Sequence, residues 1–254
     1  MPFFLLAAAL FLIWQFSKRK KTRSKPPKPP LDVRFKKLRA EVRRQQFAAD
    51  YKREHQGKTS AASYRAFNKL HNLSLTSYIV LDTETTGLSP ESDELIEVAA
   101  LRVEGDEIVD QYTTLINPGR MIPREVAKLT GISTKDILLA PVLERVAPKL
   151  GEFIEGYPVV AHNAVFHVKF VTAALRREGV YGNIQYVDTL EIAREAFPGR
   201  ADYSLDTLAR ELELPPSGQE HRAISHAQHV HALYCRCKEE LLIRVQSQKQ
   251  AKKG

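Results

Sequence analysis

The sequence predicts an α/β fold: a mixed sheet flanked by helices, preceded by an N-terminal membrane helix and a basic helical linker. Two observations predict the sheet: three β-rich stretches follow one another from residue 78 to residue 116, and strand and helix patterns alternate after residue 141. A meander followed by such alternation is typical of a mixed sheet covered by helices. The 254 residues have 43% hydrophobic content, which suffices for one full-sized domain with extensions and excludes a disordered or fibrous chain.

The first three predicted strands form the meander. The first is an apolar run that begins at Tyr78 and leads into Asp82-Thr83-Glu84-Thr85-Thr86-Gly87. Two further β-rich stretches, Leu95 to Val103 and Ile108 to Ile116, are separated by Glu104-Gly105-Asp106. This tripeptide is a hairpin signal, so these two strands are expected to be neighbours.

Hydrophobic periodicity predicts five helices and two short strands in the rest of the chain. The strands are Pro158 to Ala161 and a segment that ends near Val187. The helices are Val142 to Ile154, Ala164 to Arg177, and segments around Leu190 to Ala196, Ser204 to Glu211 and Arg222 to Arg244. We therefore expect the organised domain at residues 78–242 and a polar tail at residues 243–254.

Two carboxylates stand at the end of the first predicted strand. Side chains alternate along a strand, so Asp82 and Glu84 point to one face and Thr83 to the other. Two acids so placed repel each other unless a hard cation lies between them, and carboxylate-bound divalent metals are the usual apparatus for phosphodiester hydrolysis. Asp-x-Glu alone also fits an ordinary strand end at a solvated turn, but the longer string favours a metal site.

The positive charge of the chain is concentrated near its amino terminus. The sequence holds 38 basic and 30 acidic side chains, yet 16 of the basic and only 4 of the acidic ones precede residue 61. The remaining residues carry 22 basic and 26 acidic side chains. The organised domain is therefore mildly acidic, and its attraction for phosphate must come from bound metal and local geometry.

Residues 2–16 are almost wholly apolar, and a run of Lys and Arg follows them directly. A cleaved signal peptide carries its positive charge before the apolar run, so this order predicts an uncleaved anchor at residues 1–17. The positive-inside rule then gives a single-pass protein of the inner (cytoplasmic) membrane, with its N-terminus outside and its catalytic domain in the cytoplasm. A short hydrophobic helix buried in a partner protein is the alternative.

A basic spacer and linker connect the expected anchor to the domain. Residues 18–30 form a Pro-rich spacer, and residues 31–77 hold a basic amphipathic helix and a loop-rich linker with one short helix around Tyr64 to Leu70. Three interpretations of the amphipathic helix stay open: contact with anionic lipid, attraction of nucleic acid, and a solvated spacer.

Three motifs together resemble a known family over nearly all of residues 78–240. They are Asp82-Thr83-Glu84-Thr85-Thr86-Gly87, Ala161-His162-Asn163-Ala164-Val165-Phe166 and His221-Arg222-Ala223. In this spacing they are similar to the three exonuclease motifs of the DEDDh branch of the DEDD superfamily, which includes the proofreading epsilon subunit of bacterial DNA polymerase III and ribonuclease T. The resemblance implies a ribonuclease H-like fold and removal of nucleotides from a 3′ end with two Mg²⁺ or Mn²⁺ ions.

The resemblance also implies residue roles. Asp82 would bridge the metals, Glu84 would bind one of them, and His221 would be the general base that takes a proton from the attacking water. The residues expected to contact the substrate are Thr85, Asn163 and Phe166.

Two of the four acidic ligands expected from the family are replaced by histidine, at His167 and His226. The ligand set then carries about two negative charges rather than four, and Mg²⁺ gains little from nitrogen. Three interpretations follow: an inactive domain, a changed metal preference for Mn²⁺, Fe²⁺ or Zn²⁺, and a reduced activity with one ion held by Asp82 and Glu84. The expected metal ligands are Asp82, Glu84, His167 and His226.

The sequence thus predicts a membrane-anchored 3′-5′ exonuclease that acts on single-stranded DNA or RNA ends, with impaired Mg²⁺-dependent activity or altered metal preference. The alternative is a catalytically inactive nucleic-acid-binding or scaffold module on the same fold. A proofreading role requires a polymerase partner, and no polymerase-binding segment is recognisable in the sequence.

Overall fold

A computed structural model of the chain describes residues 63–66, 73, 75–180, 182–216 and 222–251. They contain a six-stranded mixed sheet with the strand order β1-β6-β5-β2-β3-β4. The strands are β1 (Ser63–Ala66), β2 (Ser77–Thr85), β3 (Leu95–Glu104), β4 (Glu107–Leu115), β5 (Val159–Ala161) and β6 (Asn183–Asp188). The central strand β2 pairs antiparallel with β3 and parallel with β5, so the predicted mixed sheet is confirmed.

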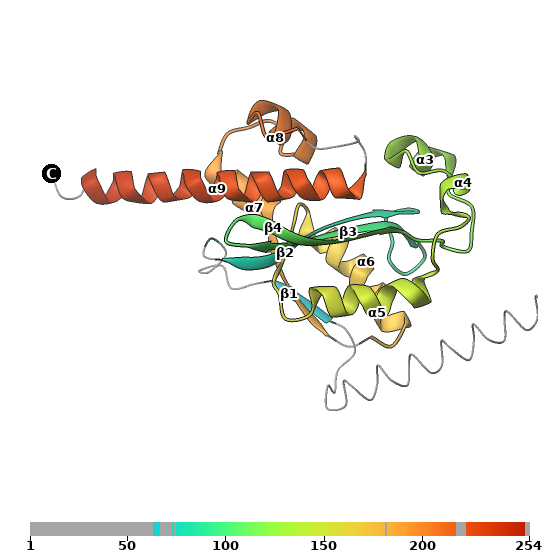
Figure 1. The fold of residues 1–254 in the computed structure, drawn as a ribbon. Coiled ribbons are helices and arrows are strands. Elements are labelled where there is room, and N and C mark those ends of the chain that lie inside the picture. Colours follow the sequence, from blue (N-terminus) through green and yellow to red (C-terminus); the bar gives the residue numbers. More distant parts are fainter. Residues whose placement is uncertain (1–62, 67–72, 74, 181, 217–221, 252–254) are drawn as a thin grey trace, which may run out of the picture. The chain divides into compact units, whose positions relative to one another are not determined.

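Helices cover both faces of the sheet (Figure 1). They are α3 (Arg124–Thr130), α4 (Thr134–Ile137), α5 (Leu143–Ile154), α6 (Ala164–Arg177), α7 (Thr189–Ala196), α8 (Leu205–Glu211) and α9 (Ala223–Ala251). In Figure 1, α9 lies along one face of the sheet with α8 beyond it, and α5 and α6 lie on the opposite face. The two acids of β2 therefore end a strand that is enclosed between these helix layers.

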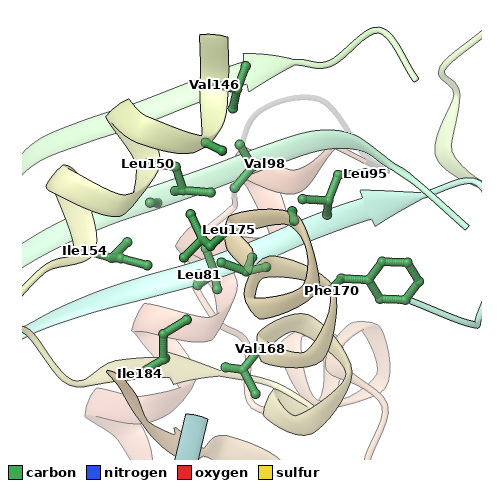
Figure 2. Close-up of a cluster of buried hydrophobic side chains, with 14 of the residues drawn as sticks. Leu81, Leu95, Val98, Val146, Leu150, Ile154, Val168, Phe170, Leu175 and Ile184 are labelled. Carbon is green, nitrogen blue, oxygen red and sulfur yellow. The ribbon is translucent and has the colours of Figure 1, made fainter. Parts of the chain in front are cut away.

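The two cores follow the alternation of side chains along β2. Ile79 and Leu81 join a cluster with α5 and α6, part of which is drawn in Figure 2. Tyr78 and Val80 point the other way, into a cluster with α7, α8 and α9. Burying one such large apolar side chain stabilises the fold by roughly 1.5–3 kcal/mol, so the alternation fixes which face each residue takes. Continued along the strand, it directs Asp82 toward α9.

The linker before the domain contributes a strand where a helix was expected. Ser63–Ala66 forms β1 and pairs in parallel with the edge of β6, so the expectation of a helix starting near Tyr64 is wrong. The physical reason is that β6 presents unpaired backbone groups along its free side, and four residues of linker satisfy them regardless of side-chain pattern.

The last helix is longer than expected. The α9 helix continues to Ala251, through most of the segment expected to be a polar tail. Arg244 still donates to the carbonyl of Glu195 at 3.1 Å and pairs with Glu240 one turn earlier, so the helix keeps partners beyond residue 242. Such i, i+4 pairs support an exposed helix.

The predicted anchor at residues 1–17, the spacer and the basic amphipathic helix all lie outside the described residues. Within the described ranges, no helix is both long enough and apolar enough to cross a bilayer.

Candidate metal centre and adjacent cleft

The metal centre begins at the carboxyl end of β2. Asp82 lies opposite Ala99 of β3, and Glu84 lies opposite Glu97. The pairing shifts register between Glu84 and Thr85, the last residue of β2. Pairing with β3 holds the backbone of both acids and so fixes their separation, whereas the pairing of β2 with β5 covers only Ile79 and Val80.

A histidine of α9 completes a group of three possible metal ligands. The Nδ1 atom of His226 lies 3.6 Å from Oδ2 of Asp82 and 3.6 Å from Oε1 of Glu84. Ligand atoms of Asp82, Glu84 and His226 all lie within 4.8 Å of one another. Asp82 is 5% exposed, and its Oδ2 atom is buried without a hydrogen-bond partner. A buried carboxylate oxygen without a donor is costly, and a cation at this point would satisfy it.

The electrostatics of the three groups favour a bound positive charge. Burial, together with the nearby Asp82 carboxylate, raises the pKa of Glu84 to about 8. The contact with Asp82 raises the pKa of His226 to about 9, although burial opposes this shift. Without metal, protons therefore occupy the place where a cation would otherwise balance the carboxylates.

Metal binding is expected to release protons at pH 7. Because the pKa values of Glu84 and His226 are raised, both groups hold protons that a metal must displace, so affinity should rise as pH increases toward about 9. The same raised pKa values mean that the metal-free fold loses stability as pH rises through this range. Calorimetric titration with Mn²⁺ in buffers of different ionisation enthalpy measures the protons released; binding without proton release would contradict this assignment.

The donor set does not fit the expected pair of Mg²⁺ ions. Two carboxylates supply at most two negative charges, and the third donor is an imidazole nitrogen, which Mg²⁺ uses poorly. Two carboxylate oxygens and one imidazole nitrogen instead fit a divalent transition metal, because such ions accept both ligand types.

The fourth expected ligand, His167, lies close to this group but outside it. Among the described residues, the three-ligand group contains only Asp82, Glu84 and His226. The Nε2 atom of His167 lies 3.5 Å from Oδ1 of Asp82, and its Nδ1 atom accepts the backbone N–H of Thr83 at 3.1 Å.

The loop before α6 positions His167 and Phe166. Asn163, in the left-handed region with φ 54°, turns the chain from β5 into α6. His162 contacts the Thr189 hydroxyl through Nδ1 at 3.0 Å and the Tyr203 carbonyl through Nε2 at 2.8 Å, and these two contacts orient the loop. Asp188 accepts the backbone N–H of Ala164 at 3.0 Å and so binds the first residue of α6 directly.

An open cleft of about 470 Å³ adjoins the start of α6. It is lined by Leu88, Ser89, Pro90, Glu91, Asn163, Val165, Phe166, Lys169 and Phe170. Two of the three expected substrate contacts, Asn163 and Phe166, are in this lining. The third, Thr85, is buried and donates its hydroxyl to the Gly87 carbonyl at 2.5 Å, so this hydroxyl supports the turn. The expected general base, His221, lies outside the described residues.

A buried acid that the sequence interpretation missed holds the start of α9. Glu97 is 1% exposed, accepts Arg222 Nε at 3.0 Å and accepts the backbone N–H of Ala223 at 3.1 Å. The available signal was an acid between Ile96 and Val98 in a β-rich stretch of mostly apolar residues, since an acid that becomes buried there needs a partner.

The turn after the two acids depends on a glycine. A Cβ atom at Gly87 would overlap the carboxylate of Asp93. That carboxylate accepts the Ser89 backbone N–H at 3.1 Å and is paired with Arg120 at 2.9 Å, so it cannot move without breaking these contacts.

Gly87→Ala is therefore expected to lower stability by about 1–3 kcal/mol through overpacking. Chemical unfolding of the variant measures this loss. In the double variant Gly87→Ala/Asp93→Ala the added methyl group no longer meets a carboxylate, so the two losses should be less than additive. Strict additivity of the two single losses would refute the steric explanation.

Comparison with known proteins supports the resemblance carried by the three motifs. The family described as Exonuclease (RNase_T) matches residues 79–234. A DNA polymerase III subunit epsilon of Aquifex aeolicus is 33% identical over 181 residues, which cover 71% of this chain and 89% of that protein. A PolC-type DNA polymerase III of Caldanaerobacter subterraneus subsp. tengcongensis is 37% identical over 164 residues, which cover 65% of this chain but only 12% of that polymerase.

Among solved structures, exonuclease X in complex with 5′ overhanging duplex DNA is similar to this chain with a TM-score of 0.51 and 26% identity. The match covers 64% of this chain and 91% of exonuclease X. The family match spans every described strand from β3 to β6 together with most of β2, and it includes both acids of the metal centre. By sequence and by fold, the chain belongs to the exonuclease (RNase_T) family.

Proposed function

We propose that this chain is a 3′-5′ exonuclease that hydrolyses phosphodiester bonds at single-stranded nucleic-acid ends with a divalent metal held by Asp82, Glu84 and His226. The observation that carries the proposal is the buried, unpartnered Oδ2 atom of Asp82, which faces His226 at the end of β2. Family membership supplies the reaction class.

The cleft at the start of α6, which is lined by the Phe166 that precedes His167, suits a terminal nucleotide. Phe166 lies in its lining and packs against Phe170 with ring centroids 5.0 Å apart, which offers an aromatic surface for a base. Leu88 is 85% exposed at the same cleft, and Lys169 supplies a positive charge for a phosphate. The names of the relatives, which refer to DNA polymerases and to a DNA complex, favour DNA as the substrate.

Different residues would bind the metal and accept the proton in the proposed reaction. A divalent ion, when bound, would make its bound water more acidic and offset the charge of the phosphate. Asp82, Glu84 and His226 would hold that ion, and His221 would accept the proton of the attacking water. Glu97 supports this arrangement because it anchors Arg222, the residue that follows His221.

The activity is proposed to prefer a transition metal to Mg²⁺. Replacement of a carboxylate by the imidazole of His226 removes an oxygen ligand that Mg²⁺ requires and supplies a nitrogen that Mn²⁺ or Zn²⁺ accepts. We expect cleavage to be faster in Mn²⁺ than in Mg²⁺ by about tenfold or more.

The test uses the full-length chain and single strands labelled at the 5′ end, incubated with Mg²⁺, Mn²⁺, Zn²⁺ or chelator. A ladder of shortened labelled products indicates removal of nucleotides from the 3′ end, and a blocked 3′ end should suppress it. DNA and RNA strands in parallel identify the substrate. Binding of the strands without cleavage under every metal condition would reject the enzyme and favour the alternative, a nucleic-acid-binding module, which the two histidine replacements would then explain.

Residues 1–17 are proposed to anchor the chain in the inner membrane, with the nuclease domain on the cytoplasmic side. Their apolar run and the basic residues that follow support this proposal. Membrane fractions of cells that express the full chain should contain the protein, and deletion of residues 1–17 should move it to the soluble fraction. Soluble full-length protein would contradict the anchor without affecting the proposed chemistry.

A further inference from the structure

The ring of His167 is hydrogen-bonded through Nδ1, and its Nε2 atom faces a carboxylate. Nδ1 lies 3.1 Å from the backbone nitrogen of Thr83 and 2.9 Å from the hydroxyl of the same residue. A backbone N–H can only donate, so Nδ1 must present a lone pair to it. A neutral imidazole with a lone pair on Nδ1 carries its hydrogen on Nε2.

That hydrogen points at the metal centre. Nε2 of His167 faces Oδ1 of Asp82 at 3.5 Å, and both residues are buried, with exposed fractions of 8% and 5%. Metal ligation through Nε2 would require its hydrogen to move to Nδ1. Two donors would then face each other between His167 and Thr83, and the buried backbone N–H would lose its acceptor.

His226 differs from His167 in this respect. Its Nδ1 atom faces two carboxylate oxygens at 3.6 Å, one of them the unpartnered Oδ2 of Asp82. Two atoms that each lie about 2.1 Å from one ion in tetrahedral coordination are about 3.4 Å apart. His226 Nδ1 is therefore within a few tenths of an ångström of the separation that a shared ion requires from each carboxylate oxygen, and the ligand atoms of all three residues lie within 4.8 Å of one another.

We infer that the centre binds a single divalent ion through Asp82 Oδ2, Glu84 Oε1 and His226 Nδ1, and that His167 is a positioning residue that holds Asp82 Oδ1 through its Nε2–H. The inference rests on the proposed function for the identity of the centre. It differs from the two-ion arrangement expected from the motifs, because one of the four expected ligands presents a hydrogen where a lone pair is needed.

The number of ions is measured by equilibrium dialysis of the full chain against Mn²⁺, followed by elemental analysis. We expect one ion per wild-type chain, one in His167→Gln, which keeps an N–H donor, and none in His226→Ala at the same free metal concentration. His229→Ala, a change on the same helix outside the three-ligand group, is the matched control and should keep one ion. Two ions per wild-type chain, or loss of the ion in His167→Gln when the variant retains its fold, would overturn the inference.

The role of His167 has its own readout. Nitrogen-detected NMR of the ¹⁵N-histidine-labelled chain distinguishes the two ring nitrogens, and Zn²⁺ serves as the probe because it is diamagnetic. Zn²⁺ should leave the Nε2–H of His167 in place and shift Nδ1 of His226. Loss of the Nε2–H of His167 on addition of Zn²⁺ would identify it as a ligand and overturn the assignment. Neither measurement uses nucleic acid, so a chain that binds one ion but cleaves nothing would reject the proposed function alone.

Discussion

Asp82→Asn is expected to abolish metal binding and to lower nuclease activity by at least about 100-fold. Asp82 supplies the unpartnered Oδ2 atom to the metal centre and also faces His167. Loss of groups that merely orient a ligand costs about 10- to 100-fold in metal affinity or activity, so loss of the ligand itself should cost more. Asparagine keeps the shape of the side chain but replaces a carboxylate oxygen with an amide.

The stability of the variant separates a lost ligand from a lost fold. At a metal concentration of 100 times Kd, metal binding should raise the free energy of unfolding of the wild-type chain by about 2.7 kcal/mol. This raises Tm by about 5–10 °C for a domain of this size. The stability of Asp82→Asn should not increase when metal is added. Without metal its stability should change little, because the substitution relieves the repulsion that raises the pKa of Glu84 but also removes the contact that raises the pKa of His226. Asp110→Asn, at an exposed acid of β4, should retain the full metal-dependent gain.

The backbone of the metal centre could be predicted from the sequence because it depends on short-range regularities. Alternation along one strand places Asp82 and Glu84 on the same face, and the helix from Ala164 to Arg177 was predicted with the bounds that the structure has. Both elements bury long apolar runs, so their patterns leave few alternatives. The approach of His226 from α9 followed from the family motif, since no local pattern relates residue 226 to residue 82.

The strand β1 and the short helices α3 and α4 could not be predicted, because they leave no recognisable pattern of side chains in the sequence. The four residues of β1 join the sheet through backbone pairing, which is largely independent of side-chain type. The helices α3 and α4 are seven and four residues long, too short for a helical period to stand out.

The roles of the two histidines that replace expected acids also could not be predicted from the sequence pattern. His167 and His226 were interpreted together as metal ligands, but in the structure His167 meets the backbone N–H of Thr83, whereas His226 faces two carboxylates. A sequence records which side chain is present but not which backbone donor it meets, and that donor determines which ring nitrogen carries the hydrogen.

Glu97→Gln is expected to destabilise the domain by about 2–3 kcal/mol. Glu97 is almost fully buried and accepts hydrogen bonds from Arg222 and from the backbone N–H of Ala223. Breaking a fully buried ion pair costs about 3–5 kcal/mol, and a third of the Arg222 side chain is exposed, which reduces the penalty. The loss should appear as a decrease in Tm of roughly 4–12 °C.

A matched control is Glu94, the residue that precedes β3. Glu94 also pairs with an arginine through two hydrogen bonds, to Arg177 at 2.8 and 2.6 Å, but both side chains are substantially exposed. Glu94→Gln should therefore cost less than about 1 kcal/mol. Equal losses of stability in Glu94→Gln and Glu97→Gln would mean that burial does not determine the strength of the Glu97–Arg222 ion pair.

The effect of Glu97→Gln should extend to the metal centre, because Glu97 lies opposite Glu84 in the β2–β3 ladder and its charge contributes to the raised pKa of Glu84. Removing that charge should lower the pKa of Glu84, and proton release on metal binding should decrease.

Hydrogen exchange in Glu97→Gln should also become faster at the first amides of α9, where Ala223 loses a charged acceptor. Because His221 directly precedes Arg222, kcat should fall even at saturating metal. If Tm decreases as expected but hydrogen exchange at the start of α9 is unchanged, the loss of stability arises in another part of the domain. Glu97 would then not be one of the residues that position the site.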